Sequence, residues 1–195
     1  MKKLIVVAIA AAFLVLASGA FAQGFDATFG FGSLTSSKAT TSNGLIFPSE
    51  RGGLYPGFTA DLLVHRRLGI EGDVFWRASQ GLYGAEPYRP IFWSFNAIWV
   101  PHISKNLSGE VLGGIGGEDL RFYGIPNFNN FTGYTNYVSS NHFMADVGAG
   151  IRGYFWHDAF IRPEVRLYLI HNNVEFSSGN VLRFGASIGY SFGGR

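Results

Sequence analysis

Hydrophobic and polar residues alternate one by one along several stretches of the chain, most clearly over residues 181–192. Successive side chains of a β-strand point to opposite faces, so this alternation predicts a strand with two different faces. One face is apolar and ends in aromatic rings, whereas the other is small and polar and carries an arginine. The apolar face holds Leu182, Phe184, Ala186, Ile188, Tyr190 and Phe192, and the polar face holds Val181, Arg183, Gly185, Ser187, Gly189 and Ser191.

Seven further stretches show an apolar face opposite a more polar one. They are residues 24–33, 54–65, 70–77, 90–100, 107–120, 142–155 and 159–170. Alternation over about 9–11 residues is the period and length of a membrane-crossing strand. The alternation over 90–100 is blurred, because Phe92, Ile98 and Val100 fall on the polar face. The stretch 107–120 is rich in glycine, and its orientation is predicted from Val111 outside and Glu110 inside.

The connections between these stretches alternate in length. Residues 66–69, 101–106 and 156–158 are short, whereas 34–53, 78–89, 121–141 and 171–180 are long and mostly rich in Ser, Asn and Gly. Short turns alternating with long loops are typical of an even-stranded barrel whose two termini lie on the same side. The sequence therefore predicts an all-β fold, an eight-stranded antiparallel up-and-down transmembrane β-barrel.

Residues 1–22 have the composition of a secretory signal peptide. Lys2 and Lys3 precede an apolar run, and Ala20-Phe21-Ala22 provides a small-x-small cleavage site, so we expect cleavage between Ala22 and Gln23. The uninterrupted apolar run 4–17 has 14 residues, fewer than the ~20 that a membrane-spanning helix needs. Residues 23–195 then form one barrel domain.

Removing the two leader lysines from the 15 basic residues leaves 13, equal to the 13 acidic residues. This balance gives no sign of a nucleic-acid partner. The chain has no cysteine, which excludes disulfides, thiol catalysis and lipidation at a lipobox cysteine.

Large aromatics such as Trp76, Trp93, Trp99 and Phe155 fall near predicted strand ends, where interfacial girdles lie. A soluble lipocalin-type barrel, with its apolar face inside, remains the alternative.

The chain resembles the small outer-membrane β-barrel family, which includes the transmembrane domain of outer membrane protein A and the X-type eight-stranded barrels. The resemblance covers about residues 24–192, and Ile188, Tyr190 and Phe192 are similar to the family's assembly signal strand. Gly193-Gly194-Arg195 follow where the family usually ends on phenylalanine. The resemblance implies an outer-membrane location with both termini periplasmic. It also implies contacts with outer-membrane lipid, lipopolysaccharide and the barrel assembly machinery.

Thirteen charged residues are predicted to face the lumen: Asp26, Asp61, Glu71, Asp73, Arg77, Glu110, Glu118, Asp146, Arg152, Arg162, Glu164, Arg166 and Arg183. Such residues can line a selective pore or a proton path. They can also form an ion-paired, filled interior. The second interpretation is favoured, because eight strands leave room only for side chains and arginine forms forked pairs with carboxylates.

A lipid A-modifying enzyme is a third hypothesis, since such enzymes place Ser, His and a carboxylate at the outer rim of a small barrel. His171 with Ser177 or Ser178 and Glu175 are the candidates, but the His-x-Ser spacing of lipid A deacylases is absent. No catalytic residue is therefore assigned. The histidines lack the fixed spacing of metal ligands, so neither a metal nor another cofactor is predicted.

These patterns favour a non-enzymatic outer-membrane protein that contributes to envelope integrity or surface interaction through its external loops; a small porin-like channel is the alternative. The candidate contact surface is the aromatic stretch 128–137, with Phe128, Phe131, Tyr134 and Tyr137. Aromatic residues on loops of a rigid scaffold favour recognition.

Overall fold

A closed ring of antiparallel strands forms the protein. The computed structural model describes residues 24–38, 48–65, 67–129 and 133–193. Over these residues the strands are β1 (Gly24–Ser36), β2 (Tyr55–His65), β3 (Leu68–Trp76), β4 (Gly81–Tyr83), β5 (Glu86–Trp99), β6 (His102–Ser104), β7 (Leu107–Asn129), β8 (Gly133–Trp156), β9 (Ala159–Ile170) and β10 (Asn180–Phe192). The short strands β4 and β6 form hairpins with β5 and β7.

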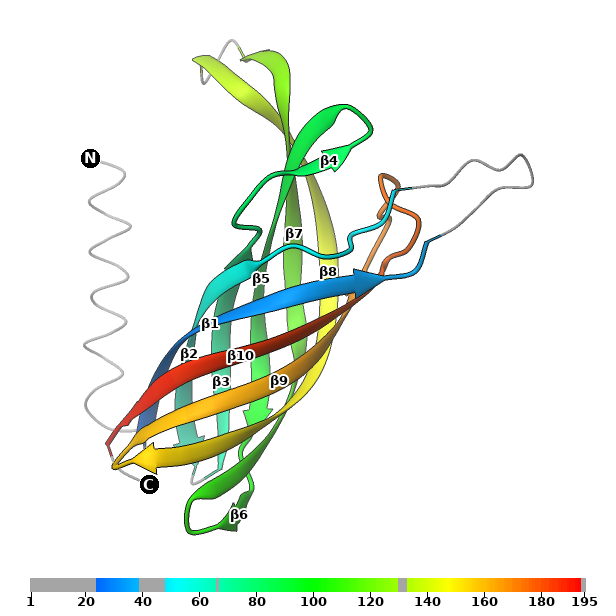
Figure 1. Cartoon of the computed structure of the whole chain (residues 1–195). Helices are drawn as coiled ribbons and strands as arrows, with labels where there is room; N and C mark the ends of the chain where they lie inside the picture. Colours follow the sequence, from blue (N-terminus) through cyan, green and yellow to red (C-terminus); the bar gives the residue numbers. More distant parts are fainter. Residues whose placement is uncertain (1–23, 39–47, 66, 130–132, 194–195) are drawn as a thin grey trace.

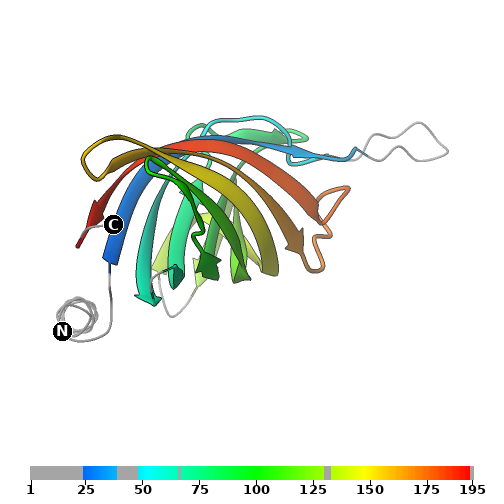
Figure 2. The same ribbon diagram turned by 90° about the horizontal axis from the view of Figure 1, so that it is seen from below.

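Eight of these strands make the barrel wall, each hydrogen-bonded to its two neighbours in the ring (Figures 1 and 2). β5 pairs with β7, and β1 pairs with β10 from Phe25 opposite Phe192 to Ser36 opposite Val181. The predicted eight-stranded, antiparallel, up-and-down barrel is confirmed. No helix in the described part of the chain is long and apolar enough to cross a membrane.

The apolar stripe of each barrel strand faces outward. On β1, for example, Phe29 and Phe31 are exposed whereas Asp26 and Thr28 are buried. Exposed large side chains continue around the wall, among them Phe58, Ile70, Trp93, Phe95, Trp99, Val111, Ile115, Phe143, Val147, Ile151, Phe155, Ile161, Phe184, Ile188, Tyr190 and Phe192. A soluble barrel would bury this face, so the observed orientation is that of a barrel surrounded by lipid.

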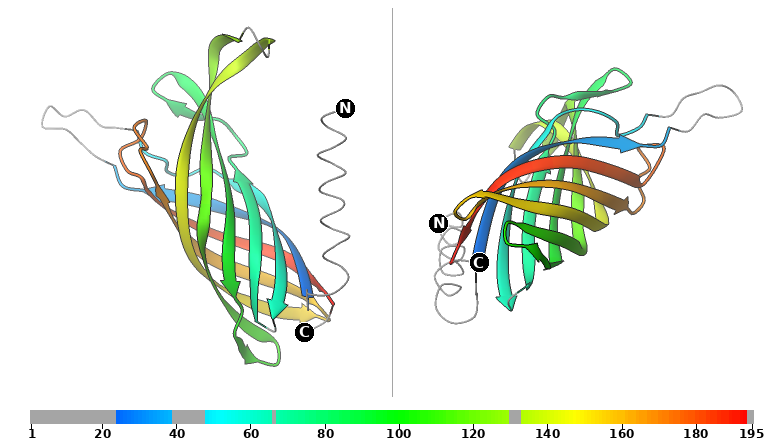
Figure 3. Two further views of the ribbon diagram at one scale, coloured as in Figure 1. Left: turned by 180° about the vertical axis from the view of Figure 1, so that it is seen from behind. Right: turned by 60° about the horizontal axis from the view of Figure 1, so that its bottom comes forward.

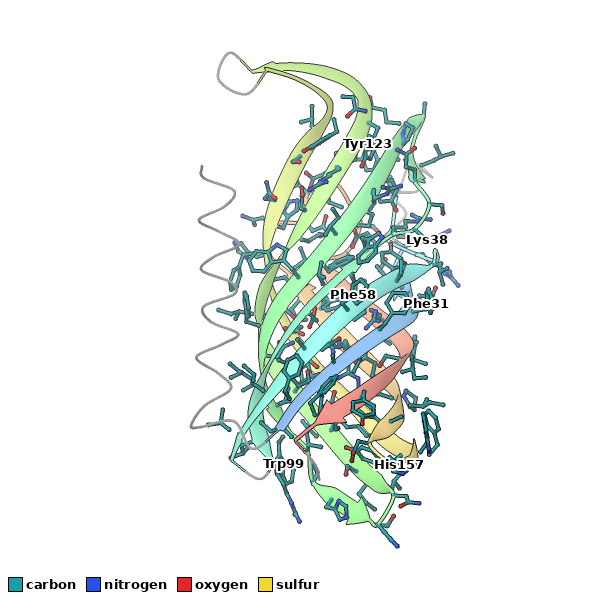
Figure 4. The ribbon with its side chains drawn as sticks, turned by 90° about the vertical axis from the view of Figure 1, so that its left-hand side faces the viewer. Phe31, Lys38, Phe58, Trp99, Tyr123 and His157 are labelled. Carbon is teal, nitrogen blue, oxygen red and sulfur yellow. The ribbon has the colours of Figure 1, made fainter. Side chains whose placement is uncertain are left out.

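The barrel has a turn end, where β2 ends and β3 begins and where the connections 100–106 and 157–158 lie, and a loop end on the opposite side. β1 begins and β10 ends at the turn end (Figure 1). Trp99 and His157 lie there, whereas Lys38 and Tyr123 lie at the loop end (Figure 4). The alternation of short and long connections predicted from the sequence therefore matches the observed arrangement.

The prediction of a loop over residues 121–141 was wrong. β7 continues to Asn129 and β8 begins at Gly133, so nearly all of this stretch belongs to a long two-stranded hairpin that extends past the other strands (Figure 3). β1 likewise runs to Ser36, three residues beyond its predicted end. Outside a membrane both faces of a strand meet water, so the hydrophobic alternation that marks a spanning strand disappears.

Glycine allows β7 to lie close to β5 at two inward-facing positions. A Cβ on Gly116 would collide with the carbonyl oxygen of Trp93, and one on Gly114 would collide with that of Phe95. Gly113, on the outer face, has Asp146 O as its nearest atom at 3.7 Å and no such crowding. The glycines of β7 therefore permit a close strand approach rather than marking a loop.

Candidate functional site

The charged interior is the largest polar assembly in the described residues. Twelve of the thirteen charged side chains named above are buried, and Arg77 is half-buried. Eleven of them form a network across the middle of the barrel. Glu118 and Arg77 lie apart from the network, nearer the loop end. Glu118 lies farther along β7 than Glu110, and Arg77 follows the last residue of β3.

Arg152 on β8 is the centre of the network nearest the turn end. Its guanidinium contacts the Asp61 carboxylate at 2.7 Å and the Glu110 carboxylate at 2.5 Å, and it also pairs with Asp26. The Arg152 side chain is fully buried, and it lies over the ring of Phe160 at 5.2 Å. One guanidinium thus joins carboxylates from β1, β2 and β7.

Arg162 and Arg166, both on β9, share the carboxylate of Glu71. Arg162 Nη1 lies 3.0 Å from Glu71 Oε2, and Arg166 Nη2 lies 2.9 Å from Glu71 Oε1. Arg166 also contacts Asp73 at 2.5 Å, and both arginines reach Glu164. Glu71 is therefore held from both oxygens, which fixes β3 against the opposite wall.

Arg183 on β10 completes the network at the side nearest the loop end. Its Nη1 contacts Glu164 at 2.5 Å, and its guanidinium carbon lies 3.5 Å from the centroid of the Phe75 ring. Asn96 and Ser94 of β5 extend the hydrogen bonding, since both donate to the Asp73 carboxylate, at 3.1 and 2.7 Å.

The two charge types come largely from opposite walls. All four arginines lie on β8, β9 and β10, whereas most of their partners lie on β1, β2, β3 and β7. The ion pairs therefore cross the lumen and brace the barrel. Seven carboxylates belong to the network against four arginines, and Asp61, Asp73 and Asp146 each keep one buried oxygen without a hydrogen-bond partner.

Apolar side chains close the interior on both sides of the network. Toward the turn end, Ile98, Val100 and Leu112 pack with Leu63. Toward the loop end, the rings of Phe92 and Tyr168 stack with their centroids 5.1 Å apart and their planes at 9°. The remaining members of that layer are Leu34, Tyr55, Met144, Ile170 and Val181. The apolar residues that blurred the alternation of β5 are thus interior residues of these two layers.

A second polar cluster lies at the loop end; Arg77 and Glu118 were predicted to face the lumen, but their separate grouping was not predicted. It contains Glu50 and Glu118, both buried, with Arg77, Tyr88, His142 and Glu175 around them. Arg77 Nη1 donates to the Tyr88 hydroxyl at 2.9 Å. Glu50 lies in an irregular segment, where no periodicity indicates which way a side chain points, so the sequence carried no signal for it.

The structure does not bring the candidate hydrolase residues together. His171 is exposed, Ser177 Oγ donates to the carbonyl oxygen of Ser37 at 2.7 Å, and Glu175 pairs with His142 at 3.0 Å. Ser178 is not part of such a set either, because its hydroxyl contacts Asn180.

His142 does lie near both a serine and a carboxylate, with Ser140 Oγ at 3.1 Å and Glu175 at 3.0 Å. Both contacts are made by the same nitrogen, Nε2. A serine relay needs one ring nitrogen for the serine and the other for the carboxylate, so this geometry is not that of a triad. The described residues also contain no group of three or more His, Cys, Asp or Glu side chains that could hold a metal ion.

Among the candidate contact residues, Tyr137 lies on β8 with its ring 6.0 Å from that of Tyr123, and the guanidinium of Arg121 lies 5.0 Å above it. Phe128 and Tyr134 oppose each other in the β7–β8 register, and Phe131 lies outside the described residues. The proposed cleavage site at Ala22 and Gln23 lies outside them as well. Ile188, Tyr190 and Phe192 form an exposed row on the outer face of β10.

Taken together, a closed ring of eight strands, an apolar exterior and an ion-paired interior define the fold of small outer-membrane β-barrel proteins. No family model matches the chain, and no curated protein matches it by sequence. Solved structures do match it.

Three of these structures are bacterial barrels. Neisserial surface protein A aligns with a TM-score of 0.58 at 12% identity, over 86% of this chain and 95% of that one. The attachment invasion locus protein of Yersinia pestis, in complex with the heparin analogue sucrose octasulfate, aligns with a TM-score of 0.55 at 14% identity, over 87% and 98%. The N-terminal barrel domain of Pseudomonas aeruginosa OprF aligns with a TM-score of 0.52 at 12% identity, over 86% and 97%. At these identities the likeness establishes the fold.

Proposed function

We propose that the protein is a non-enzymatic outer-membrane barrel that acts in surface interaction through the β7–β8 hairpin, with its turn end and both termini in the periplasm. The observation that carries this proposal is the contrast between a filled interior and a hairpin that projects from the loop end. Among the solved barrels of the same fold, one is a neisserial surface protein and another is an attachment invasion locus protein, which supports this location.

The projecting part of the hairpin is long. β7 and β8 have 23 and 24 residues, whereas a strand crosses a membrane in about 9–11 residues. About 13 residues of each strand therefore remain outside the crossing, and at about 3.3 Å per residue they extend over about 43 Å along the strand. Past Phe122 β7 no longer pairs with β5, and before Met144 β8 does not pair with β9, so both edges of the hairpin are open.

The base of the hairpin presents arginine and tyrosine together. Arg121 lies over Tyr137, and Arg89 of β5 lies 6.0 Å from the ring of Tyr123. Arginine and tyrosine are enriched among residues that dominate binding energy at interfaces. The Yersinia barrel was solved with a polyanion, sucrose octasulfate, and heparin is a suitable first probe for this surface.

The test is to remove residues 128–137 and measure binding of the barrel to immobilised heparin and to host-cell surfaces, together with envelope permeability. We expect binding to be lost while the heat-dependent gel shift of the folded barrel is kept. Replacing residues 39–47, from a different long connection, is the matched control. Unchanged binding and permeability after removing 128–137 would rule out these residues as the contact surface.

The channel alternative is weakened by the interior, where four buried arginines, their carboxylates and two apolar layers occupy the lumen. Planar-bilayer recordings decide between the two functions. We expect no steady conductance, and reproducible channels altered by Arg152→Ala or Glu164→Ala would establish a pore.

We also propose that outer-membrane lipid and lipopolysaccharide contact the apolar exterior, and that the assembly machinery recognises the Ile188, Tyr190 and Phe192 row.

A further inference from the structure

The segment 48–54, between β1 and β2, folds inward over the loop end of the barrel. The Gly52 amide donates to Leu34 O at 2.8 Å, and Ser36 Oγ donates to Glu50 O at 3.0 Å. Gly52 and Gly53 have φ angles of 72° and 90°, a conformation that favours glycine. These contacts turn the side chain of Glu50 into the barrel, where it is fully buried.

There the carboxyl group of Glu50 meets that of Glu118 on β7, and the two side chains are within hydrogen-bonding range of one another. All four carboxyl oxygens are buried, and none accepts a hydrogen bond from any donor in the described residues. Two ionised carboxylates can only accept hydrogen bonds, so they repel at this distance. The contact is stable only when the pair holds a proton, as in other buried carboxyl pairs.

The surrounding groups do not remove this requirement. The facing titratable and charged groups are Arg77 after β3, Tyr55 of β2, Tyr88 of β5, Asp119 of β7, His142 of β8 and Glu175 of the 171–179 segment. Arg77 is the one fixed cation among them, and its guanidinium also donates to Tyr88. Glu175 adds a further negative charge, and it is paired with His142.

A metal ion would also neutralise the pair, but the geometry favours a proton. Calcium and magnesium take six or more ligands and zinc takes four, whereas the described residues offer no group of three or more acidic or histidine side chains that could hold a metal ion. A proton needs only the two carboxyl groups that are present.

We propose that Glu50 and Glu118 form a proton-operated latch, which seats the 48–54 segment inside the loop end and releases it when the pair loses its proton. Burial raises the pKa of Glu50 above its ordinary value of 4.5. The seated segment therefore binds the proton more tightly than the released one. Seating is favoured at acidic pH and is lost as the pH rises from that ordinary value through the raised one.

Release of this segment affects its neighbour. The Ser177 amide donates to Pro48 O at 2.9 Å and its hydroxyl donates to Ser37 O, while Phe176 packs beside Tyr88 and Phe122. The 171–179 segment thus rests on the 48–54 segment. The latch therefore sets the exposure of two connections at the loop end, which adds a pH response to this end of the barrel.

The cysteine-free chain allows a clean spin label at exposed Arg51 through Arg51→Cys. With the labelled barrel in lipid vesicles, we expect an immobile label at acidic pH and a mobile one at alkaline pH, measured by electron paramagnetic resonance. Glu50→Gln should abolish this transition and leave the label immobile throughout, because the carboxamide donates to Glu118 without titrating. Glu86→Gln, at an exposed glutamate of β5, is the control and should leave the transition unchanged.

Two results overturn the latch: a parent label whose mobility does not depend on pH, or a transition that survives unchanged in Glu50→Gln. Repeating the titration with calcium and with a chelator separates the proton from a cation. A label that stays immobile at alkaline pH only when calcium is present would assign the pair to a metal ion instead. The heat-dependent gel shift verifies that each variant is folded.

Discussion

Replacing Arg152 with methionine tests whether the interior network stabilises the barrel. The change keeps a long side chain but leaves Asp26, Asp61 and Glu110 without the guanidinium that joins them. Removing one partner of a buried ion pair costs about 3–5 kcal/mol. Because Asp26 loses its partner and Asp61 and Glu110 keep only their contacts with Arg162, we expect a loss of about 4 kcal/mol, equivalent to about a thousandfold in the unfolding constant.

The assay is reversible urea unfolding of the barrel in lipid vesicles. Arg121→Met is the matched control, because Arg121 pairs with Asp119 at 2.8 Å but its side chain is 35% exposed. Exposed pairs contribute about 0–1 kcal/mol. High salt should reduce the small effect at Arg121 and leave the effect at Arg152 unchanged, since the latter pair is shielded from solvent ions.

A loss below about 1 kcal/mol for Arg152→Met, or one equal to that of Arg121→Met, would refute the reasoning. If Arg152→Met does not refold, adding Asp61→Asn should restore folding in part, since it removes one of the three buried negative charges that Arg152 neutralised. Failure of that second variant to improve the refolding yield would equally contradict a bracing role for the network.

Two further predictions concern packing. Gly116→Ala should lower the yield of heat-modifiable barrel, because its Cβ would strike the carbonyl oxygen of Trp93, whereas Gly113→Ala should fold normally; equal yields would show that β7 can move away from β5. Phe176→Ala should speed proteolysis of the 171–179 segment in the folded barrel, since Phe176 is buried, while Val174→Ala, at an 83% exposed side chain, should leave the rate unchanged.

The sequence specified the barrel well because lipid imposes a strict rule on every spanning strand. Outward positions such as Phe95 and Ile188 must be apolar, and this requirement imposes a period of two. The rule ends at the membrane surface, which is why the β7–β8 hairpin was interpreted as a loop. This requirement of lipid does not constrain inward positions. The apolar residues around Phe92 therefore only blurred the alternation and did not predict an interior layer.

The candidate site, too, could be predicted from the sequence only in part. Alternation alone assigned the arginines to the inner face, but which carboxylate each would meet depends on strand register and barrel tilt, which one strand's pattern does not encode. Arg77 and Glu118 were grouped with the central network for that reason. The position of Glu50 depends on how an irregular segment folds back, and only the three-dimensional structure supplies that information.

The pairing of β1 with β10 has a consequence for how the molecule forms. Phe25 lies opposite Phe192, so the ladder that closes the ring joins residues from opposite ends of the described chain. Contacts so distant along the chain slow folding, since the entropy of a long closing loop is lost before they form. Until that ladder forms, both outer strands carry unpaired backbone groups, which lipid cannot satisfy. An incomplete barrel is therefore costly in the bilayer, and we expect insertion and closure to occur as a single cooperative event.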